Sequence, residues 1–340
     1  MNYHSAKNDG IIQARISIIM PTIDYGMTFE KCAQRVLDTV RPDIGDEFIV
    51  VFDGVASEPP AWLAKSNVIL LSTGRRSGPA VARNLAAKSA GGNILLFIDA
   101  DVEIAPDVLE RVRESFDADS EIWGLFGAYD DEPPAPGTVS RFRNLLHHHT
   151  HLRHAGPAES FWTGCGAIRK DIFFNLGGFD VRYALPSIED IDLGVRAFDA
   201  GGRIELDPGI LCKHHKRWTL GSMIKTDIFQ RAIPWTRLMI SAGRFSTRLN
   251  LDHRARFSGV CAVLALALSL LSTFNFWAIL PASGCITVLY FLNRDFYKLC
   301  HSKGGIFFSL SAFFLHWLYF TYSTVTFAIV MVIEGGLLRG

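Results

Sequence analysis

Residues 95–101 read LLFIDAD, an apolar run that ends in two carboxylates, Asp99 and Asp101, separated by one residue. Uninterrupted apolar runs of this kind are typical of strands that are buried on both faces of a parallel sheet. Two carboxylates on the turn after such a strand can share a hard divalent cation with a diphosphate. A solvated turn at a strand end explains the same residues without any chemistry, so the pattern alone leaves both interpretations open.

Similar apolar runs lie around this stretch, and helical patterns separate them. Strands are predicted at residues 16–20, 47–52, 67–71 and 93–98. Apolar side chains at helical spacing predict helices at residues 28–40 and 80–89. This alternation predicts right-handed crossovers and a doubly wound α/β sheet. Ligands of such sheets bind beyond the carboxyl ends of the strands, and the polar residues at those ends are Thr22, Asp53, Asp99 and Asp101.

The next part of the chain is less regular. Residues 117–160 give no clear strand, whereas residues 161–167 predict a strand, residues 171–176 a helix and residues 191–200 another helix. The last helix is preceded by acids in the sequence IEDIDL at 188–193. The helix dipole favours acids in a first turn whatever the function. If this turn faces the ligand, however, Asp190 is placed to take a proton from an acceptor hydroxyl.

Two further motifs combine cations or histidines with aromatic residues. The sequence KHHKRW at 213–218 could contact a leaving diphosphate and a sugar face, or it could be a basic run beside a membrane. A histidine-rich stretch contains His147, His148, His149, His151 and His154. Zinc binding, contact with an acceptor phosphate or lipid headgroup, and an ordinary amphipathic surface all remain open for it.

The 340 residues include 34 basic and 34 acidic side chains, but these are unevenly distributed. Residues 1–212 carry about ten more acids than bases, and residues 213–256 about eight more bases than acids. The basic block lies beside apolar sequence rather than across the folded domain. This placement argues against a nucleic-acid partner and for an interfacial segment at the membrane surface.

Two long blocks lack any charged residue, residues 257–292 and 304–333. The first is too long for one span of a hydrocarbon core of roughly 30 Å, so we expect a hairpin that breaks near residues 272–275. The second fits one tilted span, which gives about three spans in total. The polar N-terminus and the basic residues beside the spans predict that the first domain stays on the cytoplasmic side of a multi-pass membrane protein.

Several of these motifs, in this order, resemble the family 2 glycosyltransferases with a GT-A fold. The resemblance rests on ISIIMPT at 16–22, FIVVFDG at 48–54, GPAVARN at 78–84, FIDAD at 97–101, FWTGCGAIR at 161–169, GGFD at 177–180 and EDIDL at 189–193. It implies a GT-A-type doubly wound mixed sheet domain at residues 1–218, a basic amphipathic interfacial segment at 219–256 and an all-α transmembrane segment at 257–340. No single motif is specific to this family, but the occurrence of all of them in this order and at this spacing is.

The resemblance also implies an inverting transfer of a hexose from a nucleoside diphosphate, a UDP- or GDP-sugar. The basic segment beside the first apolar block predicts that the acceptor is a membrane lipid or a lipid-linked glycan of the cell envelope, and that the final span carries Gly340 to the opposite face. The cofactor would be Mg²⁺ or Mn²⁺, held by Asp101 and Asp99. Asp190 would be the base, with Glu189 beside it. The implied nucleotide-sugar-binding residues are Thr22, Asp53, Arg83, Asp99, His214, Arg217 and Trp218.

Two departures from the family pattern keep other functions open. The family often has two acids where this chain has Phe52 and Asp53, and processive members carry QxxRW where this chain has His214 to Trp218. A processive polysaccharide synthase and a non-catalytic membrane scaffold therefore remain alternatives.

Overall fold

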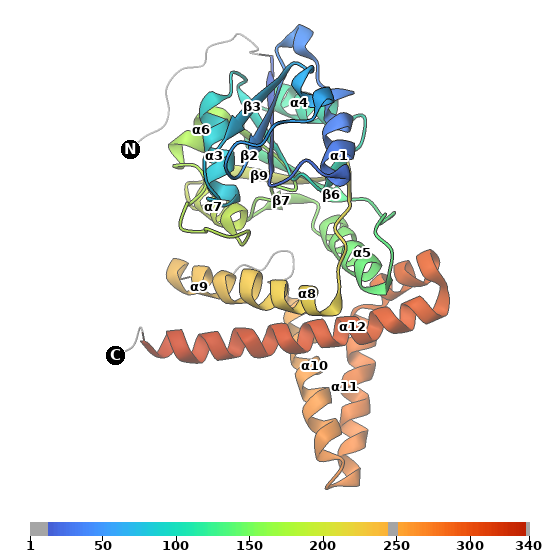
Figure 1. The fold of residues 1–340 in the computed structure, drawn as a ribbon. Coiled ribbons are helices and arrows are strands. Elements are labelled where there is room, and N and C mark those ends of the chain that lie inside the picture. Colours follow the sequence, from blue (N-terminus) through green and yellow to red (C-terminus); the bar gives the residue numbers. More distant parts are fainter. Residues whose placement is uncertain (1–12, 244–250, 338–340) are drawn as a thin grey trace.

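The computed structural model describes residues 13–243 and 251–337, which are built around a mixed sheet (Figure 1). In the described residues the sheet has nine strands, in the order β3-β2-β1-β4-β8-β6-β9-β5, with β7 paired to β9. The strands are β1 (Ile16–Thr22), β2 (Glu47–Phe52), β3 (Val68–Ser72), β4 (Ile94–Ile98), β5 (Val102–Ile104), β6 (Ile122–Tyr129), β7 (Gly156–Ala158), β8 (Cys165–Arg169) and β9 (Arg203–His214). Strands β1 to β4 run parallel, and β8 runs antiparallel to β4 and β6.

Helices cover both faces of the sheet. The helices of this part are α1 (Met27–Leu37), η1 (Pro42–Ile44), α2 (Ala61–Ala64), α3 (Pro79–Ser89), α4 (Val108–Ala118), α5 (Thr138–Arg153), α6 (Lys170–Asn175) and α7 (Glu189–Asp199). Alternate side chains of β1 and β4 pack with α1 and α4 in one core and with α3, α6 and α7 in the other. All five side chains of β4 are fully buried. This two-sided burial explains the apolar runs, and the predicted doubly wound sheet is confirmed.

Strands β6 and β9, which lie toward the β5 edge of the sheet, are not predicted from the sequence, and neither is helix α5. Strand β6 contains Gly124 and Gly127, and glycine ordinarily weakens a strand. Here glycine is required, since a Cβ at Gly127 would lie 2.2 Å from the carbonyl oxygen of Ile210 on β9. The strand predicted at residues 161–167 is confirmed only from Cys165 onward, because residues 161–164 form a turn instead.

A layer of helices lies below the sheet domain (Figure 1). Helix α8 (Leu220–Lys225), the π-helical turn η2 (Thr226–Ala232) and α9 (Ile233–Ala242) run on continuously. They occupy most of the predicted interfacial segment; residues 244–250 of that segment lie outside the described part. The long helix α12 (Arg294–Leu337) runs alongside this layer, with one kink at Gly305, where φ is +72°.

The predicted hairpin is present. Helix α10 (His253–Leu271) and helix α11 (Ile279–Leu292) pack together, and the short η4 (Phe276–Ala278) follows the break at residues 272–275. Both α10 and α12 are long and apolar enough to cross a membrane. Figure 1 nevertheless shows α12 lying across the hairpin rather than beside it. The tilted third span that the sequence predicts at residues 304–333 lies within α12, and its place in a membrane stays a prediction.

Candidate active site

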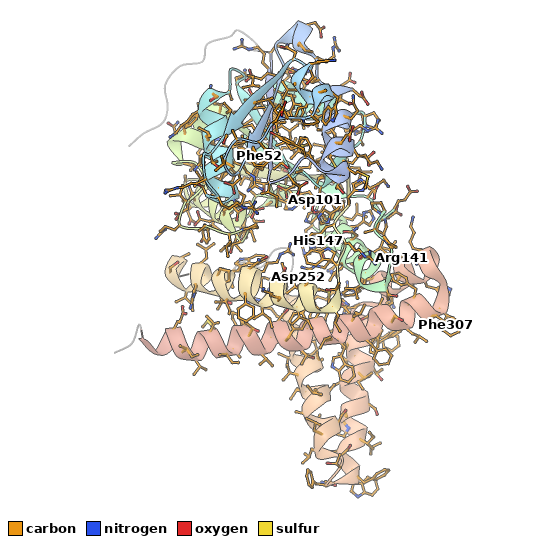
Figure 2. All side chains as sticks on the ribbon, in the orientation of Figure 1. Phe52, Asp101, Arg141, His147, Asp252 and Phe307 are labelled. Atoms are coloured by element: carbon orange, nitrogen blue, oxygen red, sulfur yellow. The ribbon has the colours of Figure 1, made fainter. Side chains whose placement is uncertain are left out.

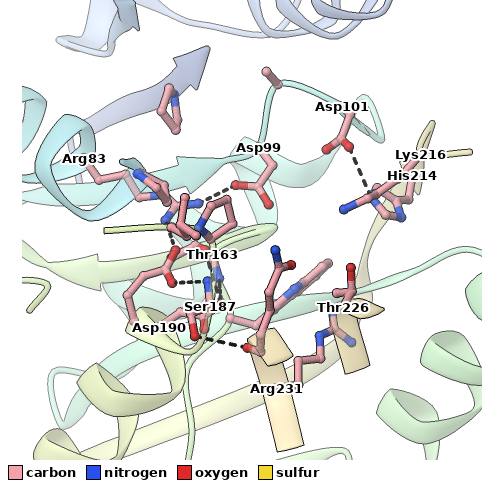
Figure 3. A pocket seen from close by; sticks show the side chains of 18 of the residues that line it. Arg83, Asp99, Asp101, Thr163, Ser187, Asp190, His214, Lys216, Thr226 and Arg231 are labelled. Carbon is pink, nitrogen blue, oxygen red and sulfur yellow. Dashed lines mark hydrogen bonds and ion pairs between the residues drawn. The ribbon is translucent and has the colours of Figure 1, made fainter. Parts of the chain in front are cut away.

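A cavity of about 730 Å³ opens at the carboxyl ends of β1, β2 and β4 (Figure 3). Its walls come from the sheet domain and from the η2–α9 helices. The sequence-predicted residues that line it are Thr22, Asp53, Arg83, Asp99, Asp101, Glu189, Asp190, His214 and Trp218. Arg217 is exposed and is not among the lining residues, so the structure does not bring it to the others.

Asp53 orders the loop after β3 at the rim of the cavity. Its carboxylate accepts hydrogen bonds from the backbone N–H groups of Ser77 and Gly78, at 2.8 and 3.0 Å, and from the hydroxyl of Thr73. Gly78 has φ +92°, and a Cβ there would lie 2.3 Å from the Ala184 carbonyl oxygen. The buried Thr22 donates its hydroxyl to the Asp24 carbonyl at the same rim. These contacts make the loop after β3 a fixed wall of the cavity.

Arg83 joins the two acidic motifs of the sequence. The buried guanidinium donates to Asp99 Oδ1 at 2.6 Å and to Glu189 Oε1 at 2.9 Å. The other carboxylate oxygen of Glu189 accepts the N–H of Ser187 at 2.9 Å. Glu189 is therefore bound in an ion pair with a buried guanidinium, and this geometry suits a residue that orients its neighbours better than a proton acceptor.

Asp190 is arranged differently, although it is adjacent to Glu189. Its carboxylate accepts N–H and O–H donors from Thr163 at 3.2 and 3.3 Å and the N–H of Ile191 at 2.8 Å (Figure 3). Burial and the nearby charge of Glu189, partly offset by Arg83, raise the pKa of Asp190 to about 6. A carboxylate with that pKa in a cavity can act as a general base near neutral pH.

Asp101 lies at the other side of the cavity, beside His214. His214 Nε2 is 3.5 Å from Asp101 Oδ2, and its ring stacks on Tyr129 at 4.6 Å. Burial tends to raise the pKa of Asp101, but the hydrogen bond and charge of His214 and the charge of Lys216 outweigh it and lower that pKa. For Asp99, burial outweighs the opposing charge of Arg83, and the pKa is raised.

The donor set at Asp101 suits a divalent cation with few protein ligands. One ionised carboxylate with a neighbouring imidazole leaves most coordination positions for phosphate oxygens. The described part of the chain contains no group of three or more His, Cys, Asp or Glu residues that could hold a metal by itself. A metal here would therefore depend on a bound diphosphate for the rest of its coordination.

Several lining residues were not singled out from the sequence. Arg143 comes from α5, Arg231 from η2, and Thr163 from the turn before β8. They belong to segments whose patterns show no strand-end motif. The excess of basic residues at 213–256 was a signal for Arg231, but it could not indicate that this side chain turns into the cavity.

The histidine-rich segment forms about the last two turns of α5 and its C-cap. His147 and His151 line the cavity, whereas His148 contacts the carbonyl of Tyr129 at 2.6 Å. His149 packs on a phenylalanine of α12, and His154 lies 3.3 Å from Asp252. Three of the five imidazoles therefore point away from the other two, and a zinc site made from this segment is not formed in the described residues.

Comparisons with known proteins agree with this description. Residues 17–177 match the family model described as glycosyl transferase family 2. A TPR repeat-containing protein of Synechococcus elongatus is 30% identical over 108 residues, which is 32% of this chain. The match spans only 26% of that curated relative, about a quarter of its length.

Among solved structures, a mannosyltransferase from Pyrobaculum calidifontis in complex with GDP-Man and Mn²⁺ superposes with a TM-score of 0.58 at 17% identity, covering 92% of this chain and 86% of the other. The crystal structure of S. aureus TarS 1–349 gives a TM-score of 0.49 at 15% identity, with 94% and 92% covered. The first likeness shows the fold. Residues 17–177 match the glycosyl transferase family 2 model, and the chain shares the GT-A-like fold of the mannosyltransferase.

Proposed function

We propose that this chain is a metal-dependent, inverting glycosyltransferase that moves a hexose from a nucleoside diphosphate to an acceptor at the membrane. The proposal rests on one observation: two acids with different electrostatic environments line the same cavity. Asp101 keeps a lowered pKa beside His214, and Asp190 has a raised pKa on the opposite wall. One acid suits a cation and the other suits a proton transfer.

The donor would lie along the strand ends. Thr22 and the loop held by Asp53 suit the nucleoside, and Lys216 with His214 suits the diphosphate. Asp101, assisted by Asp99 or His214, would hold Mn²⁺ or Mg²⁺, and that ion would offset the charge that develops on the leaving diphosphate. The mannosyltransferase with the similar fold was solved with GDP-Man and Mn²⁺. This supports a sugar nucleotide as the class of donor and a divalent cation as the class of metal.

The transfer would be a single displacement. The acceptor oxygen attacks C1 of the sugar while the bond from C1 to the diphosphate oxygen breaks, and the electron pair leaves with the diphosphate. The acceptor hydroxyl loses its proton to Asp190. Arg83 and Glu189 act as positioning residues, because their ion pair fixes the first turn of α7 relative to Asp99. The protein supplies mainly orientation and electrostatics.

The test uses the purified full chain with a panel of UDP- and GDP-sugars, with and without Mn²⁺ or Mg²⁺. Metal-dependent stabilisation by one sugar nucleotide, followed by its turnover, is the expected result. Absence of both binding and turnover for every donor would leave the scaffold interpretation. Product length separates a single transfer from the processive alternative, because a synthase makes a ladder of products.

We also propose how the helices are placed in the membrane. The α10–α11 hairpin would insert, since its tip carries the exposed Phe274, Phe276 and Trp277, side chains suited to the far interface. Helix α12 would lie along the near interface. Its exposed apolar side chains recur every three or four residues along one face and include Phe307, Leu310, Phe314, Leu318, Val325, Ile329 and Val332.

Helix α12 also makes ion pairs with the sheet domain and with α9. Lys303 makes an ion pair of 2.6 Å with Asp131 of the sheet domain, and Glu334 makes one of 2.6 Å with Arg237 of α9. Figure 2 shows Phe307 at one end of this helix and Asp101 and His147 above it. These two ion pairs, one to the sheet domain and one to α9, would keep the C-terminal end of α12 on the membrane face that carries the cavity. This replaces the expectation that a final span carries Gly340 to the opposite face.

Labelling with an impermeant maleimide in sealed vesicles tests this membrane topology. Cysteines placed at Ser302 and Gly340 should label from the face of the catalytic domain, and one at Thr273 from the opposite face. The unsubstituted chain is the control, because five of its cysteines are buried and Cys285 is half-buried. If Gly340→Cys labels together with Thr273→Cys, the flat position of α12 is wrong.

A further inference from the structure

The cavity has a second cationic region that the donor site does not use. Arg143 of α5 and Arg231 of η2 both line it, together with His147 and His151. Figure 3 shows Arg231 and Thr226 on the side away from Asp99 and Asp101. This region faces the helical layer below the sheet domain, so it lies toward the proposed membrane surface.

The charges of this region are only partly balanced within the chain. Arg143 donates to Asp227 Oδ1 at 2.5 Å, and the hydroxyl of Tyr322 donates to the other oxygen of Asp227 at 2.6 Å. That carboxylate is therefore fully used. In the described residues, the polar partner of the Arg231 guanidinium is His147 Nε2, at 3.1 Å, and no carboxylate lies within ion-pair distance.

His147 cannot neutralise Arg231. Burial, and then the charges of Arg143 and Arg231, lower the pKa of His147 well below its usual range. The imidazole is therefore neutral and accepts a hydrogen bond from the guanidinium. Arginine itself stays protonated in proteins. Among the described residues, the charge of Asp227 acts on Arg231, but this carboxylate is bound to Arg143, so no carboxylate pairs directly with the Arg231 guanidinium.

An unused donor supports the same conclusion. Arg143 Nε has no hydrogen-bond partner in the described structure, although the side chain is more than nine-tenths buried. Buried polar atoms are almost always paired in protein structures. A polar or anionic ligand atom that enters this side of the cavity would accept a hydrogen bond from this donor.

We propose that Arg231, supported by His147 and Arg143, binds a phosphate group of a lipid-linked acceptor. The inference rests on the proposed glycosyl transfer and specifies its acceptor. Leu146 and Trp235 add apolar surface to the same side of the cavity, and Phe229 is exposed on the η2 turn, as an acyl or isoprenyl chain would require.

The phosphate serves to anchor the acceptor and is not the nucleophile. A phosphate oxygen is already ionised and needs no base, whereas the site provides one in Asp190. The acceptor therefore presents a hydroxyl to Asp190 while its phosphate is held at Arg231. In the transfer, that hydroxyl oxygen bonds to C1 of the sugar, its proton goes to Asp190, and the donor diphosphate leaves with the electron pair. The phosphate at Arg231 is unchanged.

The matched variants are Arg231→Gln and Arg237→Gln. Arg237 lies six residues further along the same helical layer, is largely exposed and does not line the cavity. Binding of octyl phosphate, octanol and inorganic phosphate to the full chain is measured by calorimetry, alongside binding of the donor with Mn²⁺. Octyl phosphate should bind the unaltered chain more tightly than octanol or inorganic phosphate, and Arg231→Gln should weaken it at least tenfold. Arg237→Gln should not change it, and donor affinity should stay the same in both variants.

Each other result counts against the proposal in a distinct way. Loss of donor affinity in Arg231→Gln with unchanged octyl phosphate binding would assign Arg231 to the donor diphosphate. If inorganic phosphate binds as tightly as octyl phosphate, the claim that the ligand is a lipid is wrong. If octyl phosphate does not bind to the unaltered chain, the claim of a phosphate site is wrong. Donor turnover in the same preparation shows separately whether the glycosyltransferase proposal holds. If Arg231→Gln does not fold, Arg231→Lys keeps the charge but loses the planar fork, and it should retain only part of the affinity.

Discussion

Replacing Asp190 by asparagine should inactivate the enzyme and stabilise the fold at the same time. The side chain keeps its size, but it loses both the capacity to accept a proton and the buried charge. Loss of a general base costs about 10²- to 10⁴-fold in rate, which is roughly 3–5 kcal/mol of barrier. Donor affinity should change little, because Asp190 contacts Thr163 and Ile191 rather than the strand ends.

The stability change follows from the pKa. Folding raises the pKa of Asp190 from 3.8 to about 6, so the ionised form destabilises the folded state above pH 6 and the penalty disappears below about pH 4. A shift of this size corresponds to about 3 kcal/mol. Water in the open cavity screens part of it, so we expect a gain of about 1–2 kcal/mol at pH 7.5. That gain is a Tm rise of roughly 2–8 °C, and it should fade as the pH falls from 6 to 4.

The measurements are kcat at saturating donor, donor Kd by calorimetry, and Tm from pH 4 to 8. The unaltered enzyme should also gain kcat/KM as the pH rises through about 6. Asp192→Asn is the matched control on the same helix turn. It removes a carboxylate that bonds Arg196 at 2.8 Å and does not line the cavity, so it should lower Tm and spare kcat. A kcat within tenfold of normal in Asp190→Asn would refute the base assignment, and a lowered Tm at pH 7.5 would refute the charge-burial argument.

Three further changes test other parts of the site. Asp101→Asn should abolish the stabilisation by Mn²⁺ and donor together, measured as Tm, and a metal response equal to that of the unaltered chain would contradict the cation assignment. Arg83→Met should destabilise the fold by about 3–5 kcal/mol, measured by urea unfolding, because it leaves Glu189 and Asp99 unpaired; unchanged stability would show that the network is not needed. Gly194→Ala should cost about 3 kcal/mol, since its Cβ would lie 2.2 Å from the backbone nitrogen of Phe161, and a Tm close to that of the unaltered chain would show that α7 is not packed this tightly.

The sequence pattern was sufficient for the first half of the sheet. Strands β1, β2 and β4 are local apolar runs whose burial on both faces leaves few alternatives, whereas the edge strand β3 is partly exposed. Parallel strands place their carboxyl ends along one edge. For that reason Thr22, Asp53, Asp99 and Asp101 could be grouped from the sequence alone. Strands β6 and β9 were not predictable in this way, because the glycines of β6 are explained only by the backbone of the strand beside it.

The sequence by itself indicated the parallel strands near the donor site, the acids at their carboxyl ends, and the helical hairpin with its break. Only the tertiary structure decided which of two adjacent acids forms an ion pair with an arginine and which accepts hydrogen bonds from neutral donors. Glu189 and Asp190 are adjacent and chemically alike, and they differ because Arg83, 106 positions before Glu189, reaches one and not the other. Likewise Arg143 contacts Asp227 across 84 positions, whereas Arg231 has no carboxylate within ion-pair distance among residues 13–243 and 251–337. Hydropathy periodicity is a local property, whereas the balance of buried charges and the direction of α12 depend on contacts between distant segments.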